Sequence, residues 1–435
     1  MLSRPLRPML GALLVFHLVA CGGGGSSTPS SSTGSIASSS DGVATLLAAS
    51  QQGQTLVLQH ASPSGTVRLV LDLTRGGLVS EASVAGRNFV NADDTGRGVQ
   101  FALYDGEAAY DSCAGCSGNW GWNPVLGGNR ANVGSPVLSS SLVGDALQVT
   151  SRTSQWAGTA TGDDTTVEQT VTAVPNEPYA FQVDFRLTNN GTQDRAYSLQ
   201  ELPSAYAGAA YRRLVSYSGS QPFTGAATSS YTLAGLDTTP APHTASERWF
   251  ALVDDAGQGL TVYAPGSDTV VRGFATADTA FARLDTPLSI LAGQSITGRY
   301  YLIVGDHAAA RQTIYRLKAA GTDAALDLTA PVGALDAPAA GASLTGSVLV
   351  SGWAVDNGVV NGVEVRVDGQ RVADAALGVL RPDVQAAVAG APGDAGFTLP
   401  LDTRAWANGA HTIEWRARDA AGNTHLQRRQ VTFSN

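Results

Sequence analysis

The chain has 435 residues and a formal net charge of −9. The acidic balance and the lack of a basic stripe exclude a nucleic-acid partner, because nothing would neutralise the phosphates. The composition is rich in Gly, Ser, Thr, Val and Asp, and Lys318 is the single lysine. Turn formers and β-branched residues without long Ala/Leu/Glu/Lys runs predict an all-β protein, and the length predicts two domains.

The N-terminal segment predicts export. Arg4 and Arg7 precede an apolar stretch too short to span a bilayer comfortably, so residues 1–20 are expected to be a signal peptide. The letters LVAC ending at Cys21 resemble the lipobox of bacterial lipoproteins. That resemblance implies lipidation of Cys21, a stable membrane anchor. Because Gly22 rather than Asp follows, it also implies an outer-membrane lipoprotein facing the periplasm or the cell surface. The alternative is an ordinary secretory signal.

The next part of the chain changes from a Gly/Ser-rich tether to a long series of strands. Residues 21–42 are too polar to bury a core and are expected to stay a flexible coil. Residues 43–322 contain alternating apolar and polar runs around turn signals, notably RGG, NNG and DDAGQG, and a helix is expected from 308 to Gly321. So many long antiparallel strands predict a large two-sheet sandwich.

Three stretches of this region carry a resemblance to a known fold. The letters GGLVSEASVAGRNFVN, VDFRLTNNG and GQGLTVY occur in that order between residues 76 and 263. They resemble the galactose-mutarotase-like supersandwich, which occurs in sugar epimerases and as domains of polysaccharide lyases and glycoside hydrolases. Aldose epimerases place a catalytic His shortly after the TN strand. Here the corresponding stretch, RAYSLQELPSAY, contains Gln200 and Glu201 and no His. The resemblance therefore implies the fold, does not favour mutarotase activity, and by itself supplies no other function.

Two cysteines, Cys113 and Cys116, remain once Cys21 is assigned to lipid. In an exported protein, a CAGC pair favours a small-loop disulfide. Free thiols are one alternative. A zinc knuckle is another, but it would need two further Cys or His ligands, and none stands near in the sequence.

Polar and aromatic residues that interrupt the strand pattern are candidates for a binding site. Aromatic faces suit the C–H surfaces of sugars, and planar polar groups suit their hydroxyls and carboxylates. The expected substrate-binding residues are Arg97, Gln100, Tyr104, Trp120, Trp122, Asn123 and Trp249. Trp120 and Trp122 could equally plug the end of the sandwich, and Arg97 could equally form an ion pair with Asp93 or Asp94.

Four residues are candidates for catalysis. Glu201 and Glu247 could form the carboxylate pair of a glycoside hydrolase. A lyase would instead need a base such as His243 or Tyr206, with Arg97 neutralising a substrate carboxylate. Ion pairs with neighbours such as Arg212 or Arg248 would explain both glutamates equally well.

The C-terminal part has the clearest strand rhythm. After an expected linker at 323–340, residues 341–435 alternate at period two between turns such as DNG, DGQ and AAGN, which predicts a small β-sandwich. The letters GWAVDNGVVNGVEVRVDG and NGAHTIEWRARDAAGN resemble a bacterial Ig-like module. Trp353 and Trp415 are expected in its core. Asp419 could serve either a calcium site or, more simply, a turn cap.

The sequence therefore predicts a cell-surface lipoprotein with a mutarotase-like supersandwich followed by an Ig-like sandwich. It is expected to bind extracellular polysaccharide and leaves open whether it degrades it by hydrolase or lyase chemistry. The alternative is a non-catalytic glycan-binding, adhesin-like or structural envelope protein. No cofactor, metal or nucleic acid is expected, the membrane is expected to be contacted only through the lipid anchor, and the chain is expected to be a monomer.

Overall fold

The computed structural model describes residues 47–94, 96–103, 125–129, 131–155, 164–197, 201–235, 242–267, 269–286, 288–321, 327 and 329–435. The expected signal peptide and tether, Cys21 included, lie outside these residues. The described residues form antiparallel sheets with few helices, which confirms the all-β class.

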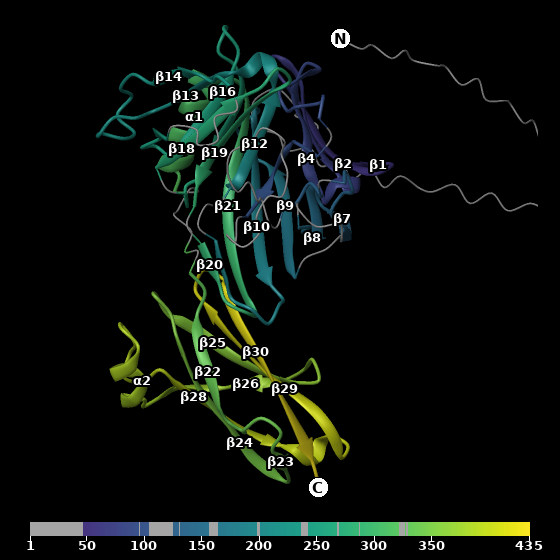
Figure 1. Ribbon diagram of the computed structural model, residues 1–435, viewed down its shortest axis with the longest axis vertical. Coiled ribbons are helices and arrows are strands. Elements are labelled where there is room, and N and C mark those ends of the chain that lie inside the picture. The colour runs from purple at the N-terminus through teal and green to yellow at the C-terminus, as the bar shows by residue number, and fades with distance from the viewer. Residues whose placement is uncertain are drawn as a thin grey trace, which may run out of the picture. The chain divides into compact units, whose positions relative to one another are not determined.

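The first large sheet has ten strands in the order β1-β2-β3-β4-β6-β12-β19-β18-β15, with β5 paired to β4 (Figure 1). All of these pairings are antiparallel. The strands are β1 Ala48–Gln52, β2 Thr55–Ser62, β3 Gly65–Asp72, β4 Leu78–Val84, β5 Arg87–Asn88, β6 Val99–Ala102, β12 Glu201–Gly208, β15 His243–Thr244, β18 Val270–Ala275 and β19 Thr279–Asp285.

The second large sheet follows the order β14-β13-β16-β17-β21-β10-β9-β8-β7, and a separate small sheet joins β11 to β20. The turn signal NNG lies at the end of β10, before β11, and DDAGQG connects β16 to β17, as expected from the sequence. The strands are β7 Val137–Val143, β8 Ala146–Arg152, β9 Thr165–Ala173, β10 Ala180–Asn189, β11 Arg195–Tyr197, β13 Arg213–Ser216, β14 Ser229–Thr232, β16 Trp249–Val253, β17 Gln258–Tyr263, β20 Leu288–Ile290 and β21 Gln294–Asp306.

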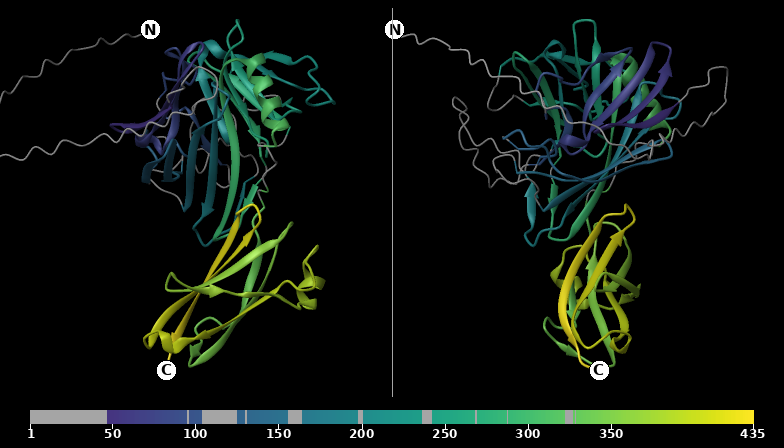
Figure 2. Two further views of the ribbon diagram at one scale, coloured as in Figure 1. Left: turned by 180° about the vertical axis from the view of Figure 1, so that it is seen from behind. Right: turned by 90° about the vertical axis from the view of Figure 1, so that its right-hand side faces the viewer.

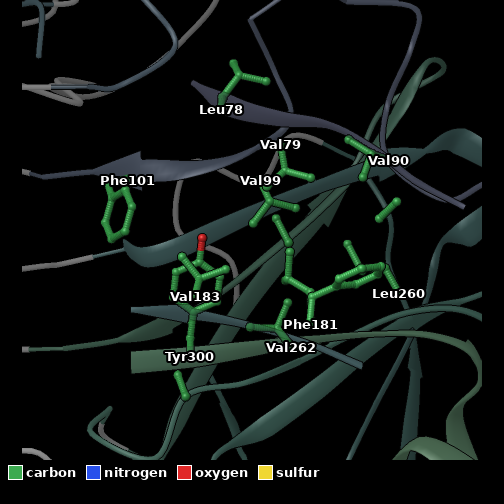
Figure 3. Packing of buried hydrophobic residues seen from close by; sticks show 14 of the residues in the cluster. Leu78, Val79, Val90, Val99, Phe101, Phe181, Val183, Leu260, Val262 and Tyr300 are labelled. Atoms are coloured by element: carbon green, nitrogen blue, oxygen red, sulfur yellow. The ribbon is translucent and has the colours of Figure 1, made fainter. Parts of the chain in front are cut away.

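The core of this region lies between the two large sheets. Figure 3 shows Val79 and Val99 of the first sheet near Phe181, Val183 and Val262 of the second. At its centre the ring of Phe101 packs edge-on against Phe185 at 4.9 Å and Tyr300 at 5.9 Å between centroids. Apolar residues at every second position supply this layer, as the alternating sequence predicts.

Strand β21 is buried on both faces. Tyr300 and Leu302 point into the core between the sheets, whereas Tyr301 and Ile303 pack in a second apolar cluster with helix α1. Helix α1, His307–Ala319, starts where the Asp306 carboxylate accepts the N–H of Ala309 at 2.8 Å. It occupies the expected helical segment and covers β17 and β21, which explains the unbroken apolar run of β21.

The C-terminal strands form a β-sandwich of their own, coloured green to yellow in Figure 2. One sheet has the order β22-β24-β28-β27, and opposite it β29 pairs with β25 and β30, with β26 and β23 at the edges. The elements are β22 Val332–Ala337, β23 Ser343–Leu344, β24 Ser347–Val355, β25 Val360–Val367, β26 Gln370–Asp374, β27 Ala376–Val379, α2 Pro382–Ala387, β28 Gly396–Asp402, β29 Gly409–Asp419 and β30 Thr424–Phe433.

Trp415 lies in the core of this sandwich, 1% exposed, with its ring 5.2 Å from that of Phe397. Trp353, on β24 of the opposite sheet, is partly buried against a smaller cluster that includes Val355 and Val384. The expected linker at 323–340 contains a strand, β22, that pairs with β24 from Val332 to Ala337. The sandwich therefore begins before residue 341. The prolines of this segment suggested a linker, but proline is compatible with a strand at a sheet edge, which is where β22 lies.

None of the helices in the described residues has the length and apolar character needed to cross a bilayer.

Candidate functional site

Four neighbouring strands of the ten-stranded sheet, β6, β12, β19 and β18, have one face in the core and one face turned away from it. Every second residue, such as Val99, Ala205 and Ala282, points into the core cluster. Residues directly opposite each other in antiparallel strands share a face. We call the opposite face the polar face; its members are Gln100, Ser204, Tyr206, Arg272, Phe274, Phe281, Arg283 and Asp285.

The polar face consists of two adjacent rows set by strand register. Ser204 lies opposite both Gln100 and Arg283, and Arg283 lies opposite Arg272, which gives one polar row across four strands. Two residues along the strands, on the same face, Phe281 lies opposite both Tyr206 and Phe274, which gives an aromatic row. Charged and aromatic groups thus stand side by side on one sheet face.

An ionic cluster stands at one side of this face. The Asp285 carboxylate accepts from Arg272 Nε at 2.9 Å and lies 3.1 Å from Arg283 Nε. Arg283 and Asp285 are only 5% and 7% exposed. Breaking a buried ion pair by removing one partner is costly, so Arg283 and Asp285 depend on each other in the folded protein.

The aromatic row is also buried. The ring centroid of Phe281 lies 4.7 Å from those of both Tyr206 and Phe274. The guanidinium of Arg97 lies 5.7 Å from the centroid of the Tyr206 ring, within range of a cation–π contact. Arg97 also pairs with Asp94 at 2.8 Å, which is the ion pair that the sequence offered as an alternative. The ion pair is therefore present, and the substrate-binding role of Arg97 stays a prediction.

Gln100 connects the polar face to two loops. Its side-chain amide donates to the carbonyl of Gly96 at 3.0 Å and accepts the N–H of Gly127 at 2.6 Å. A Cβ on Gly127 would lie 2.5 Å from the Gln100 oxygen, so only glycine fits there. Gln100 thus positions the loop that carries Arg97.

Of the expected site residues, the structure brings Arg97, Gln100 and Tyr206 together. The backbone of Glu201 stands opposite Asp285 and Ala102, at the same end of the face. The register of β12 shifts between Glu201 and Ser204. The side chain of Glu201 is outside what the structure describes.

Glu247 lies elsewhere, beneath α1 on the second sheet. It is fully buried, and its carboxylate accepts both Nε and Nη2 of Arg311, at 2.9 and 2.8 Å. It also accepts Trp249 Nε1 at 2.7 Å, the Tyr315 hydroxyl at 2.8 Å and the N–H of Phe223 at 2.8 Å. Its ion-pair partner is thus Arg311 rather than Arg248. Glu247 and Trp249 hold α1 to the sheet, away from the polar face.

His243 is on the edge strand β15 of the ten-stranded sheet, and its side chain is on the core side of the sheet rather than on the polar face. It stands opposite Val271, a member of the core cluster, whereas the neighbouring Arg272 belongs to the polar face. Its ring stacks on Tyr231 at 3.7 Å between centroids, and burial lowers its pKa. Side chains alternate across a strand, so His243 does not join Tyr206 and Arg97.

Six further candidates, Tyr104, Trp120, Trp122, Asn123, Cys113 and Cys116, lie outside the described residues. The expected aromatic platform and disulfide stay predictions.

Sequence reasoning missed Arg272, Phe274, Phe281, Arg283 and Asp285. The signal is in the letters VVRGFA and TAFARLD, where small or apolar residues alternate with large polar or aromatic ones. That period of two places the two kinds of residue on opposite faces of a strand. Near the polar face, the described residues contain no group of three potential metal ligands; the group found lies in the Ig-like module.

Comparison with known proteins identifies the C-terminal module. Residues 331–414 match the model of the bacterial Ig domain family. This module is a bacterial Ig-like domain. No curated protein matches the chain.

Among solved structures, the chain is similar to an endo-β-1,4-mannanase from Thermotoga petrophila (15% identity, 29% of this chain and 24% of that one, TM-score 0.19). It is also similar to a polysaccharide lyase (9% identity, 88% and 47%, TM-score 0.29). A third is a candidate mutarotase, YeaD, from Salmonella typhimurium (10% identity, 60% and 94%, TM-score 0.34). The chain spans about a quarter of the mannanase and about half of the lyase.

The buried environment of Glu247 predicts a structural role. Glu247→Ala leaves the Arg311 charge buried without its partner and is expected to lower the free energy of unfolding by about 3–5 kcal/mol. The control is Asp374→Ala, which breaks an exposed pair with Arg371 and is expected to cost about 0–1 kcal/mol. Denaturant unfolding measures both. A Glu247→Ala protein of unchanged stability would contradict the structural role.

The same carboxylate predicts acid sensitivity. Burial alone would raise the pKa of Glu247, but the hydrogen bonds from Arg311, Trp249, Phe223 and Tyr315 hold it below its ordinary value of 4.5. A lowered folded pKa contributes stability above the unfolded pKa, and this contribution is lost as pH falls through the folded value. The denaturant concentration at the unfolding midpoint should therefore stay level from pH 7 to about pH 4.5 and decrease as the pH is lowered further. In Glu247→Gln the fall should be shallower; an identical slope would contradict this assignment.

Proposed function

We propose that this protein binds an extracellular polysaccharide at the polar face. The observation that carries the proposal is the aromatic row of Tyr206, Phe274 and Phe281 beside the ionic cluster around Asp285. A sugar presents C–H surfaces to flat rings and hydroxyl groups to planar, bidentate polar groups. The aromatic rings and the polar groups stand here in neighbouring rows, two residues apart along each strand.

The arginines favour an acidic sugar. Arg97 comes from the loop before β6, and Arg272 and Arg283 come from adjacent strands. Guanidinium groups match carboxylates in fork geometry, and the partly exposed side chain of Arg97 is the one that a polymer can reach, with the Arg272 and Arg283 charges behind it. We therefore extend the proposal to a polysaccharide that contains uronate residues.

Tyr206 and Arg97 also support a lyase reaction on such a chain. The Tyr206 phenolate would remove the proton next to the uronate carboxylate, and an arginine would stabilise the charge that develops on that carboxylate. The C–O bond on the neighbouring carbon then breaks, and its oxygen takes the proton now held by the Tyr206 hydroxyl, which restores the phenolate and leaves an unsaturated uronate. Hydrolysis through a Glu201–Glu247 pair has less support, because Glu247 is fixed beneath α1. Non-catalytic glycan binding is the second candidate.

The location follows from the N-terminal sequence. We propose that Cys21 carries lipid and attaches the protein to the outer membrane, on its periplasmic or outer face, with residues 22–42 as a tether. The support is the lipobox-like LVAC sequence. Cys21→Ala is expected to move the protein from the membrane fraction to the soluble fraction and to abolish labelling by a fatty-acid probe. Persistent labelling of this variant would overturn the anchor.

Binding is tested with a uronate polymer, such as polygalacturonate or alginate, and the same polymer after chemical reduction of its carboxyl groups. The wild-type chain should bind the acidic polymer and lose most of its affinity for the reduced one. Arg97→Gln should weaken binding at least about tenfold, since a hydrogen bond to a charged group is worth roughly 1.5–3 kcal/mol. The matched control is Arg404→Gln, which removes an exposed arginine, also paired with a nearby aspartate, from the Ig-like module. Equal affinity for both polymers would remove the acidic-sugar proposal.

Turnover is tested on the polymer that binds, by absorbance of new unsaturated ends and by release of reducing ends. Tyr206→Phe should lose at least about a hundredfold in kcat, the lower range for a general base, with KM little changed. Binding without new ends in the wild-type chain would favour the non-catalytic function instead. Reducing ends without unsaturation would favour a hydrolase.

A further inference from the structure

A groove lies where the second large sheet meets the Ig-like module. Strand β30 pairs there with β21, so that Thr424 stands opposite Ser295. The groove has a volume of about 520 Å³, which is within the range of small-molecule sites. Its described lining consists of hydroxyl, amide and charged side chains and Gly422. We call it the junction groove; a lining of this kind suits a hydrophilic ligand.

Strand register places much of this lining in one continuous row. Thr188 of β10 lies opposite Ser295 of β21 and opposite Thr166 of β9. Across the junction, Thr424 lies opposite Arg418 of β29. Because residues directly opposite each other in antiparallel strands share a face, the row crosses five strands on one face.

Two further arginines stand beside this row. Arg186 and Arg416 each precede a member of the row by two residues, on β10 and β29, and therefore share its face. The residues between, Leu187 and Ala417, belong to the cores of the two sandwiches. The arginines consequently face away from both cores and line the groove.

Hydrogen bonds fix the two sides of the groove to each other. The side-chain oxygen of the buried Asn423 accepts the N–H of Thr297 at 2.6 Å, and Thr297 Oγ1 donates to the carbonyl of Ala421 at 3.0 Å. Arg186 Nη2 donates to the carbonyl of Gly422 at 3.3 Å. The turn between β29 and β30 is thus held against β21 and β10, which gives a ligand a preorganised site.

Arg416 lacks a partner within the described residues. None of its nitrogens donates a hydrogen bond there, and its Nε is buried. The carboxylates beside it are already occupied, because Glu364 pairs with Arg366 and Glu414 pairs with Arg428. A partly buried guanidinium without a counter-charge is costly, and an anion in the groove would offset that cost.

The other charges of the groove leave it positive. Arg418 is exposed and, in the described part of the chain, forms neither an ion pair nor a hydrogen bond through its side chain. The lining has three arginines and a single glutamate, the exposed Glu168. Burial lowers the pKa of Arg416, and the charge of Arg366 lowers it further, so its positive charge is under-compensated in the folded protein.

We propose that the junction groove binds an acidic sugar, with the sugar carboxylate at Arg416 and Arg418. Guanidinium groups form charge-assisted, fork-shaped pairs with carboxylates. Hydroxyl groups such as those of Thr166 and Thr424 can both donate to and accept from sugar hydroxyls. The volume of the groove is larger than one inorganic anion needs, which favours a sugar. The choice of a uronate rests on the proposed function, whereas the groove is built from other strands than the polar face.

The test is calorimetric titration of the full chain with tri-galacturonate, and with its methyl ester as the uncharged control ligand. The wild-type chain should bind the acid at two sites and lose most of its affinity for the ester. Arg97→Gln, which weakens the polar face, should leave the groove binding at full affinity. Loss of all binding in this variant would overturn the groove alone. A single site that Arg97→Gln does not affect would instead contradict the polar face alone.

Variants of the groove are compared in the Arg97→Gln background. Arg416→Gln should weaken the remaining site at least about tenfold, because it removes hydrogen bonds to a charged group. Arg418→Gln changes an exposed residue and should fold normally, with binding weakened by about two- to fivefold. The matched control Arg371→Gln removes an exposed arginine, paired with Asp374, from the same module and should change nothing.

Two results would overturn the assignment. One is that Arg416→Gln and Arg418→Gln bind the acid as tightly as the control variant does. The other is that free sulfate displaces tri-galacturonate at equal concentration, which would show that the groove takes a bare oxyanion rather than a sugar.

Discussion

The packing of the two large sheets against each other decides where the remaining side chains of this region can lie. Once Val99, Ala205 and Ala282 are committed to the core, the intervening residues of β6, β12 and β19 have to point to the opposite face. A slip of one residue in register would exchange the two sets. The polar face therefore depends on the same apolar contacts, around Phe101 and Tyr300, that hold the sandwich together.

The two groups of buried charge in this region have different surroundings. Glu247 has five hydrogen bonds from four residues, and they attach α1 to the outer side of the second sheet. Every acceptor position of this carboxylate is occupied from within the protein, so it has little left to offer a ligand. The Asp285 cluster is also paired internally, with Arg272 and Arg283, but it adjoins aromatic rings and the loop that carries the partly exposed side chain of Arg97. The proposed binding site is placed on the polar face because of that loop and those rings.

The C-terminal module adds a third kind of charged group. Its match to the bacterial Ig domain family covers residues 331–414 and leaves Arg416 and Arg418 just beyond its end. These two residues lie beside the outer face of the second large sheet because β30 pairs with both β29 and β21. They have no carboxylate partner among the described residues, which distinguishes them from the ion pairs elsewhere in the chain. Asp419, on the same strand, accepts the N–H of Asn423 at 2.8 Å, so the expected turn cap is present.

The sequence by itself determined the all-β class, the helix after the last long strand and the Ig-like module, because these depend on local period, turn residues and a matching pattern of residues. It also pointed to Arg97, Gln100 and Tyr206. Only the tertiary structure separated these from Glu247 and His243, since strand register and the side of the sheet on which a residue lies are not local properties. The same holds for Arg283 and Asp285, whose partner Arg272 is on a neighbouring strand, and for the arginines of the junction groove. Contacts between residues far apart in the chain are set by how the sheets pair and pack, and no short stretch of sequence records that choice.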